Sequence, residues 1–337
     1  MNKKDDHIRY ALNQEITTND FDALRFVPNS IPKTDVHLVD LSVDLFNQTF
    51  PYPIYINAMT GGTEKAYAIN KSLAQIAKHF NFMIASGSLS QAIKDPKTSP
   101  SFTILRETFK EGFILANIGI SAPLDYCDKA IDLLNANAIQ IHINAPQEII
   151  MPEGDRIFHD WLTNLNHHAK HVKVPIIAKE TGFGMSRETI EMIQLAGIKT
   201  IDVSGRGGTN FIAIENNRRK RPLKSFESYG FSTVESLLEA KKIEGITVLA
   251  SGGIRDAYDV VKALALGAKA VGLSGFFLKL VTKYPIDLAI EMIEEFLEDI
   301  KKIMAILDAK TIHDLKNKPL LYSETLINFI NQRNQSL

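Results

Sequence analysis

The chain has 337 residues, of which 45% are hydrophobic and 23% charged, and its formal net charge is −1. This composition supplies enough apolar material for a packed core, and it gives no excess charge that would attract nucleic acid or a membrane surface. The only cysteine, Cys127, excludes an internal disulfide and a thiolate metal cluster and fits a reducing compartment.

The N-terminal segment is charged from its third residue onward and lacks the apolar centre of a secretory signal. No uninterrupted apolar run in the chain reaches membrane-spanning length. We therefore expect a cytoplasmic protein that binds neither nucleic acid nor a membrane. Residues 1–50 precede the first strand-like run and form an N-terminal extension.

Short apolar runs rich in Ile, Val and Ala recur along the rest of the chain and predict eight strands. They lie at 53–59, 82–88, 113–119, 138–144, 175–181, 200–205, 247–253 and 270–276. Helical periodicity separates them at 65–80, 124–135, 187–195, 234–243 and 256–266. Cys127 falls at the start of one such helix, where we expect a packing residue rather than a nucleophile.

Eight apolar strands that alternate with helices predict an α/β fold, a (β/α)8 TIM barrel. A doubly wound open sheet is the alternative, but no edge strand with polar alternation is evident. Residues 51–337 then form the barrel together with C-terminal helices. The long amphipathic segment that begins at Ile286 has no sign of chemistry and is expected to cover the barrel wall.

A charged, irregular insertion from 214 to 231 follows the sixth predicted strand. It lies at the carboxyl end of that strand, where barrels carry mobile loops. Its basic cluster is read as part of a solvated lid or a subunit contact rather than as a nuclear address, and comprises Arg218, Arg219, Lys220 and Arg221.

The segment 139–148, IQIHINAPQE, carries the densest group of polar side chains. Isoleucines alternate with Gln140, His142 and Asn144, so one face of this strand is apolar and the other polar. A proline then ends the strand, and Gln147 and Glu148 follow close enough to share a site with His142 and Asn144. A half-exposed strand that faces water is the simpler alternative.

Glycine-rich loops follow the last three predicted strands and contain SGRGGTN, SGGIRD and LSGF. In barrels, the final loops often bind phosphate through backbone N–H groups and a helix N-terminus. Glycine allows the phosphate to approach the backbone closely. The residues expected to contribute are Ser204, Gly207, Gly208, Thr209, Gly252, Gly253, Ser274 and Gly275.

Small hydrogen-bonding groups follow the first three strands, in MTGG at 59–62, in SGSLSQAIKDP at 86–96 and at Asn117. Such groups suit the edge of a flat heteroaromatic ring. Lys179 closes an apolar run, so we expect its ammonium group to enter the barrel mouth and to stabilise an anionic ring, although a lysine reaching toward water is possible. Together these features predict bound flavin mononucleotide, FMN.

Glu148 supplies one hard oxygen ligand, which is typical of Mg²⁺ held jointly with the phosphates of a substrate. A second anion site is thereby implied. Lys3, Lys4 and His7 are candidates for closing over that diphosphate from the N-terminal extension, although a lysine pair at a terminus is commonly only solvated.

The chain resembles the type 2 isopentenyl-diphosphate delta-isomerases, which are FMN-dependent barrels. The resemblance rests on motifs spread through most of the chain, namely KKDDH at 3–7, AMTGG at 58–62, GSLSQAI at 87–93, HINAPQE at 142–148, KETGFGMS at 179–186, DVSGRGGTN at 202–210 and SGGIRD at 251–256. One departure is visible, since the family usually has Arg-Lys where this chain has Lys3-Lys4, so the bidentate fork of arginine is lost while the charge is kept.

The resemblance implies a 1,3-proton shift that converts isopentenyl diphosphate to dimethylallyl diphosphate, with reduced FMN, Mg²⁺, and NADPH as the flavin reductant. It also implies a homo-oligomer, a tetramer or an octamer. The catalytic residues carried over are Gln147, His142 and Asn144, and Glu148 binds the metal. Substrate contacts fall on Lys3, Lys4, His7, Ser88 and Gln147. FMN contacts fall on Ala58, Met59, Thr60, Ser88, Asn117, Lys179, Ser204, Thr209, Gly252, Gly253, Arg255, Ser274 and Gly275.

Three rivals remain to be distinguished. An FMN-dependent hydroxy-acid oxidase would need a catalytic histidine in the loop after the sixth strand, where this chain has Arg206. A relative of IMP dehydrogenase would need a loop cysteine, and Cys127 precedes a helix in another repeat. A flavin-binding module without activity is the third possibility.

Overall fold

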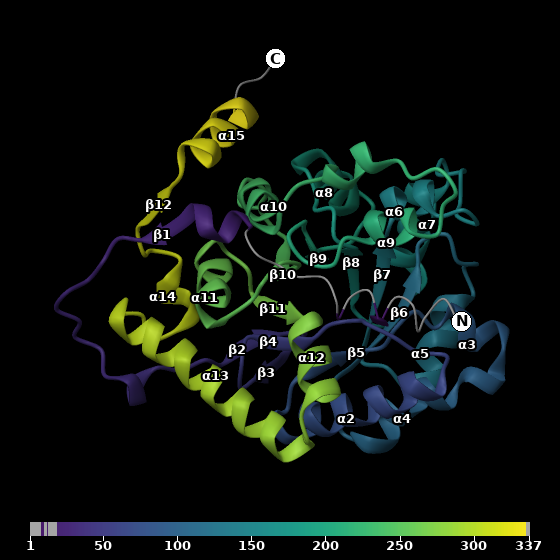
Figure 1. The fold of residues 1–337 in the computed structure, drawn as a ribbon, viewed down its shortest axis with the longest axis horizontal. Helices are drawn as coiled ribbons and strands as arrows, with labels where there is room; N and C mark the ends of the chain where they lie inside the picture. The colour runs from purple at the N-terminus through teal and green to yellow at the C-terminus, as the bar shows by residue number, and fades with distance from the viewer. Residues whose placement is uncertain (1–7, 10–11, 13–18, 335–337) are drawn as a thin grey trace.

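A computed structural model describes residues 8–9, 12 and 19–334 of the chain. Within this part, eight parallel strands close into a barrel in chain order (Figure 1). They are β4 (Ile54–Ile56), β5 (Met83–Ala85), β6 (Ile114–Gly119), β7 (Ala138–Ile143), β8 (Ile176–Glu180), β9 (Thr200–Asp202), β10 (Thr247–Ser251) and β11 (Ala270–Leu273). The (β/α)8 prediction is confirmed and the open sheet is wrong, because β11 pairs with β4.

Helices follow every barrel strand and cover its outer face. They are α2 (Glu64–Phe80), α4 (Pro100–Thr108), α5 (Tyr126–Leu134), α7 (Trp161–His171), α8 (Arg187–Leu195), α10 (Thr233–Ala240), α11 (Ala257–Ala265) and α12 (Gly275–Lys283). Side chains of Ser186, Ser232 and Asp256 cap the first turns of α8, α10 and α11. Such caps satisfy N–H groups that a helix start leaves unpaired, which fixes where these helices begin.

The barrel strands are shorter than the apolar runs that predict them. The run at 200–205, for example, is a strand only over β9, and the backbone then turns at Ser204, whose φ is +33°. An L-residue rarely adopts this left-handed conformation, so it marks a strained turn. The residues beyond each strand end form the loops that build the candidate site.

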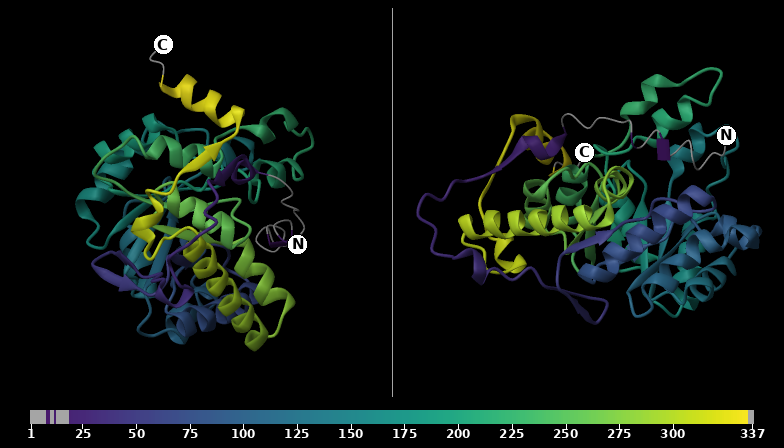
Figure 2. Two further views of the ribbon diagram at one scale, coloured as in Figure 1. Left: turned by 90° about the vertical axis from the view of Figure 1, so that its left-hand side faces the viewer. Right: turned by 60° about the horizontal axis from the view of Figure 1, so that its bottom comes forward.

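The described part of the N-terminal extension runs along the outside of the barrel. Its strand β1 (Leu24–Phe26) pairs antiparallel with β12 (Leu320–Tyr322) near the C-terminus, and Figure 2 shows this purple segment beside the yellow one. A hairpin of β2 (Val43–Leu45) and β3 (Gln48–Phe50) then leads into β4. Closure of residues 1–7 over a substrate concerns residues outside the described part and stays a prediction.

The C-terminal helix α13 (Ile286–Ile306) packs against α11, which confirms the expectation that it covers the barrel wall (Figure 1). Its buried side chains recur at helical spacing and include Ala289, Ile293, Leu297 and Ile300. Between α13 and α15 (Glu324–Asn334) lies the short helix α14 (Ile312–Leu315). None of the helices in the described ranges has the length and apolar character that crossing a membrane requires.

The insertion at 214–231 is more ordered than its sequence suggests. It begins inside a helix, α9 (Phe211–Asn216), and contains a 3₁₀ helix, η4 (Lys224–Ser228). Four residues of α9 are almost fully buried: Ile212, Ile214, Glu215 and Asn216. The prediction of an irregular segment therefore holds only between and after these two helices, since α9 packs against the short helix α6 (Ala145–Ile150) that follows β7.

Candidate active site

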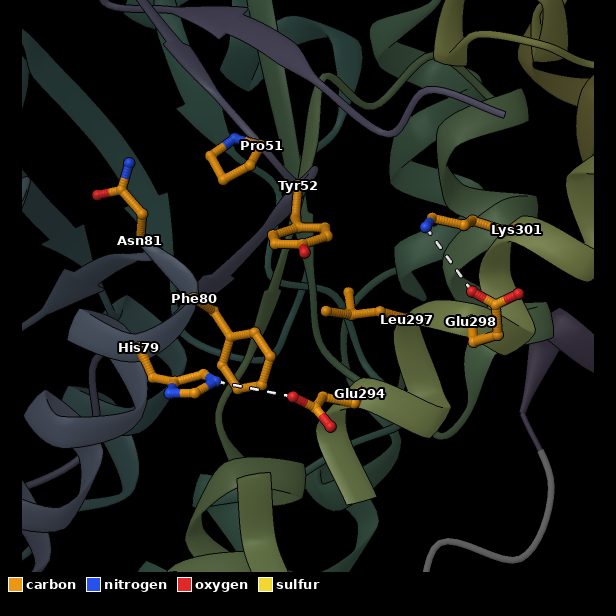
Figure 3. A pocket seen from close by; sticks show the side chains of 9 residues that line it. All are labelled: Pro51, Tyr52, His79, Phe80, Asn81, Glu294, Leu297, Glu298 and Lys301. Carbon is orange, nitrogen blue, oxygen red and sulfur yellow. Dashed lines mark ion pairs between the residues drawn. The ribbon is translucent and has the colours of Figure 1, made fainter. Parts of the chain in front are cut away.

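The two ends of the barrel differ: one has a hollow in the surface, and the other has the polar side chains predicted from the sequence. A hollow of about 480 Å³ lies beside Tyr52, Phe80 and Glu294, and Figure 3 shows its lining. Tyr52 precedes β4 and Phe80 precedes β5, so this hollow is at the amino ends of the strands. The polar groups predicted from the sequence gather at the opposite, carboxyl ends, where barrel enzymes place their sites.

The turn from β7 into α6 brings three of the predicted residues together. The Asn144 side chain donates from Nδ2 to Glu148 Oε1 at 2.8 Å and lies 3.4 Å from Gln147 Oε1. Pro146 is accommodated in the first turn of α6, where its missing N–H costs nothing. The predicted cluster of Asn144, Gln147 and Glu148 therefore exists at the carboxyl end of β7.

A carboxylate that was not predicted from the sequence also joins this cluster. Glu215 of α9 is fully buried, and its Oε1 accepts a hydrogen bond of 3.3 Å from Gln147 Nε2. Its Oε2 pairs with Arg218, which also binds Glu153 at 2.7 Å. A buried carboxylate requires such partners. Arg218 belongs to the basic cluster expected to be solvated, and it is exposed, although its guanidinium also pairs with these two carboxylates.

The glycine loops after β9 and β10 pack backbone to backbone. A Cβ built on Gly252 would lie 2.1 Å from the Gly205 oxygen, and one on Gly208 would lie 2.8 Å from the Gly253 nitrogen. Gly252 and Gly253 also have φ values of +94° and +72°. Glycine is required here because any side chain would separate the two loops.

The loop after β11 differs, because it is open above the backbone. A Cβ built on Gly275 would meet nothing within 4 Å, and Ser274 makes no side-chain cap to α12. The neighbouring helix α11 is capped by Asp256 instead. Uncapped N–H groups at a helix start, with open space in front of them, fit a phosphate group.

Small polar groups at the ends of β4 and β5 fit the ring of a flavin. The buried hydroxyl oxygens of Thr60 and Ser86 have no hydrogen-bond partner among the described residues. Buried hydroxyl groups are normally paired, so these two are suited to a ligand. Thr60 was predicted as an FMN contact, but Ser86 was not. The serine predicted from the loop after β5 is Ser88, which is half-buried. Ala58 and Met59, just before Thr60, are also half-buried.

Lys179 is buried, which confirms that it does not reach into bulk water. Its Nζ donates to the Glu180 carbonyl at 2.7 Å and lies 3.4 Å from Ser204 Oγ. Burial lowers the pKa of Lys179, while the carboxylates of Asp202 and Glu180 oppose that shift. The strained backbone of Ser204 thus brings its hydroxyl to the lysine, and both groups lie at the carboxyl ends of β8 and β9.

Two other residues predicted to bind FMN, Arg255 and Thr209, contact other residues of the protein. The Arg255 guanidinium binds Asp22 and Asp259, with its shortest contact 2.6 Å long. It fastens the N-terminal extension to the start of α11. Thr209 is half-buried in the loop before α9, and its carbonyl lies near Gly182. A contact from either residue to FMN stays a prediction.

The predicted diphosphate and metal ligands divide between described and undescribed residues. Lys3, Lys4 and His7 lie outside the described part of the chain. Glu148 is in place, and its Oε2 also accepts from the Asp155 N–H at 2.8 Å. The residues that the structure describes contain no group of three or more His, Cys, Asp or Glu side chains suited to a metal. This donor set fits a Mg²⁺ ion that takes its other ligands from a substrate.

Comparisons with known proteins agree with this picture. The FMN-dependent dehydrogenase family matches residues 144–322. A protein of Staphylococcus saprophyticus named isopentenyl-diphosphate delta-isomerase is 46% identical over 334 residues, which is 98% of this chain and 96% of that protein.

Two solved structures share the fold. A flavocytochrome b2 variant with sulfite bound has a TM-score of 0.70 at 20% identity and covers 100% of this chain and 86% of its own. A mandelate oxidase variant with an FMN adduct has a TM-score of 0.65 at 16% identity and covers 94% of this chain and 92% of its own. At these identities the likeness shows a shared fold alone.

Proposed function

This chain belongs to the isopentenyl-diphosphate delta-isomerase family, and from that membership we propose how its residues carry out the reaction. The enzyme converts isopentenyl diphosphate to dimethylallyl diphosphate and is a flavoprotein that binds FMN. One proton is added to the terminal carbon of the double bond, and another leaves the allylic carbon next to the internal carbon of that bond. The double bond moves by one position, and no electrons are gained or lost.

FMN would be held along the carboxyl ends of the strands. The uncapped start of α12 at Ser274 and Gly275 would bind its phosphate, and Thr60 with Ser86 would meet the edge of its ring. Lys179 would bring a positive charge to the ring. Reduced FMN supplies the acid-base chemistry that ordinary side chains lack for an unactivated alkene near neutral pH.

Gln147 and Glu215 are the groups of this chain that we assign to the prenyl end of the substrate. The Gln147 amide would orient the prenyl group of the substrate, and a hydrogen bond of 3.3 Å links this amide to Glu215 Oε1. Glu215 is the carboxylate that can hold the departing proton at Oε1, since Arg218 occupies its other oxygen. This contact between Gln147 and a buried carboxylate is the observation that carries the proposal.

The diphosphate end completes the proposal. Glu148 would hold Mg²⁺ on the diphosphate oxygens, with Asn144 keeping the carboxylate in position at 2.8 Å. Lys3, Lys4 and His7 would close over the same group. NADPH would serve only to bring FMN to its reduced state. A homo-oligomer and a cytoplasmic location belong to the proposal as well, and a sequence with a single cysteine fits a reducing compartment.

The loop after β9 argues against a hydroxy-acid oxidase. Arg206 takes the place of the histidine that would accept the alcohol proton, and its guanidinium donates to the Ser228 carbonyl at 2.9 Å. A guanidinium is not a base at any ordinary pH. Hydride removal from an alcohol would therefore have no base in this loop.

An anaerobic assay tests the proposal. Purified protein with photoreduced FMN and Mg²⁺ should convert isopentenyl diphosphate, and Gln147→Leu should lower the rate while FMN stays bound. Turnover with oxidised FMN and no reductant would contradict the mechanism. Oxidation of a 2-hydroxy acid without isomerase activity would favour the rival enzyme.

A further inference from the structure

The interior of the barrel contains a carboxylate with four hydrogen-bond donors around it. Asp202 is fully buried at the end of β9. Its Oδ2 accepts from Tyr55 Oη at 2.6 Å and from Asn57 Nδ2 at 2.9 Å, and its Oδ1 accepts from Ser251 Oγ at 2.7 Å and from the Ser204 N–H at 3.1 Å. A group that receives four donors and gives none has the bonding pattern of an ionised carboxyl.

A chain of three side-chain amides leads from Asp202 to His142. Gln140 Nε2 donates to Asn57 Oδ1 at 3.0 Å, and Asn117 Nδ2 donates to Gln140 Oε1 at 3.3 Å. Asn117 Oδ1 then lies 2.7 Å from His142 Nδ1. All three amides are at least 96% buried, because their exposed fractions are 1% for Asn57, 4% for Asn117 and 0% for Gln140.

The direction of this chain is fixed at its beginning. Asp202 can only accept, so Asn57 must turn its NH₂ group toward Asp202 and its oxygen toward Gln140. The backbone N–H of Ala58 donates to the same Asn57 oxygen at 2.8 Å, which is independent support for that orientation. Gln140 and Asn117 must then each donate toward Asp202 and accept from the side of His142.

The last acceptor in the chain determines the state of the imidazole. Asn117 Oδ1 needs a donor, and the group beside it is His142 Nδ1. Nδ1 therefore carries a proton, and in the neutral ring Nε2 is the acceptor. His142 Nε2 lies next to Gly119 at the end of β6, and a Cβ built on this glycine would lie 3.0 Å from it.

We propose that Asp202 is a positioning residue that fixes the Nδ1–H tautomer of His142 through Asn57, Gln140 and Asn117. His142 Nε2 is then the ring nitrogen that accepts a hydrogen bond or a proton from a group bound at the carboxyl ends of the strands. The tautomer follows from the network alone, whereas its use in isomerisation rests on the proposed function.

The test uses the FMN-bound enzyme labelled with ¹⁵N-histidine. Long-range ¹H–¹⁵N correlation spectra distinguish protonated from unprotonated ring nitrogens, and His142→Gln identifies the signals of His142. The wild-type neutral ring should show a protonated Nδ1 and an unprotonated Nε2. An unprotonated Nδ1 would overturn the proposal without any variant.

Two variants should break the chain at different points. Asp202→Asn replaces the acceptor-only end with a group that can also donate, and Gln140→Met removes the middle amide at similar volume. Each should give a mixture of tautomers, and kcat should fall roughly 10- to 100-fold with a smaller change in KM. Wild-type spectra in both folded variants would overturn the proposal, as would a kcat loss without any change in tautomer.

Tyr55→Phe is the matched control. It removes one donor from the same oxygen of Asp202 but leaves all three amides in place. Its His142 signals should match those of the wild type. Because the spectra require no turnover, an inactive enzyme with the expected tautomer would refute the proposed function and leave this inference standing.

Discussion

Replacing Gly275 by alanine tests directly where the phosphate of FMN binds. Gly275 is the first residue of α12, and a Cβ there meets no atom within 4 Å. The substitution therefore introduces no clash within the described protein. Alanine also favours the helix over glycine by up to about 1 kcal/mol, so the FMN-free protein should be as stable as the wild type or slightly more stable.

The same methyl group would occupy the space that we assign to the phosphate. Losing one hydrogen bond between a backbone N–H and a charged oxygen costs about 1.5–3 kcal/mol. Since about 1.4 kcal/mol corresponds to a factor of ten, the affinity for FMN should fall about 10- to 100-fold. Stability and cofactor affinity thus change in opposite directions, which a general folding defect cannot produce.

Fluorescence titration of FMN-free protein with FMN measures the affinity, and thermal unfolding without FMN measures the stability. Gly267→Ala is the matched control, because Gly267 follows the neighbouring helix α11, has a φ of +111° and also meets no atom within 4 Å. It should lose about 1 kcal/mol of stability from backbone strain and keep its FMN affinity. Unchanged affinity in Gly275→Ala would show that the phosphate binds elsewhere.

Three other predictions follow from the site and the core. Glu215→Gln should lower kcat by about 100-fold or more with FMN retained, since an amide cannot hold the proton, whereas Glu153→Gln, which alters the exposed partner of Arg218, should have little effect on kcat. Glu148→Gln should raise the Mg²⁺ concentration for half-maximal activity about tenfold, and an unchanged magnesium titration would remove Glu148 from the metal site. Burial raises the pKa of Cys127 to about 12, so its thiol stays protonated at pH 8 and should react with a thiol reagent at least about 100-fold more slowly in the native protein than after unfolding; fast native labelling would contradict its assignment as a packing residue.

The sequence predicts the barrel well because each strand is marked by its own composition. A run such as 138–144 has an apolar, β-branched face, and it becomes β7 with Ile139 and Ile141 fully buried. The cluster of Asn144, Gln147 and Glu148 is predictable for a related reason. These three residues lie within five positions of one another, so the local turn alone brings them together.

Glu215 and Asp202 could not be predicted in the same way. Glu215 is 68 residues from Gln147, and their contact depends on how α9 packs against α6. The sequence around it, IENNRRKR, has the polarity of a solvated segment. Asp202 is the third residue of the run at 200–205, and its carboxylate is as compatible with a solvent-facing turn as with a buried network. Burial of these groups is set by tertiary packing rather than by local pattern.

The polar interior also constrains the register of the strands. Asn117 is paired with Gln140, and Gly119 with His142, across β6 and β7. A slip of one residue in either strand would turn its polar side chains outward toward the apolar helices and leave their partners in the barrel without hydrogen bonds. The correct register is thus the one in which every amide from Asp202 to His142 is satisfied. The same network that orients the imidazole disfavours misaligned barrels, so the fold and the geometry of the site depend on one set of hydrogen bonds.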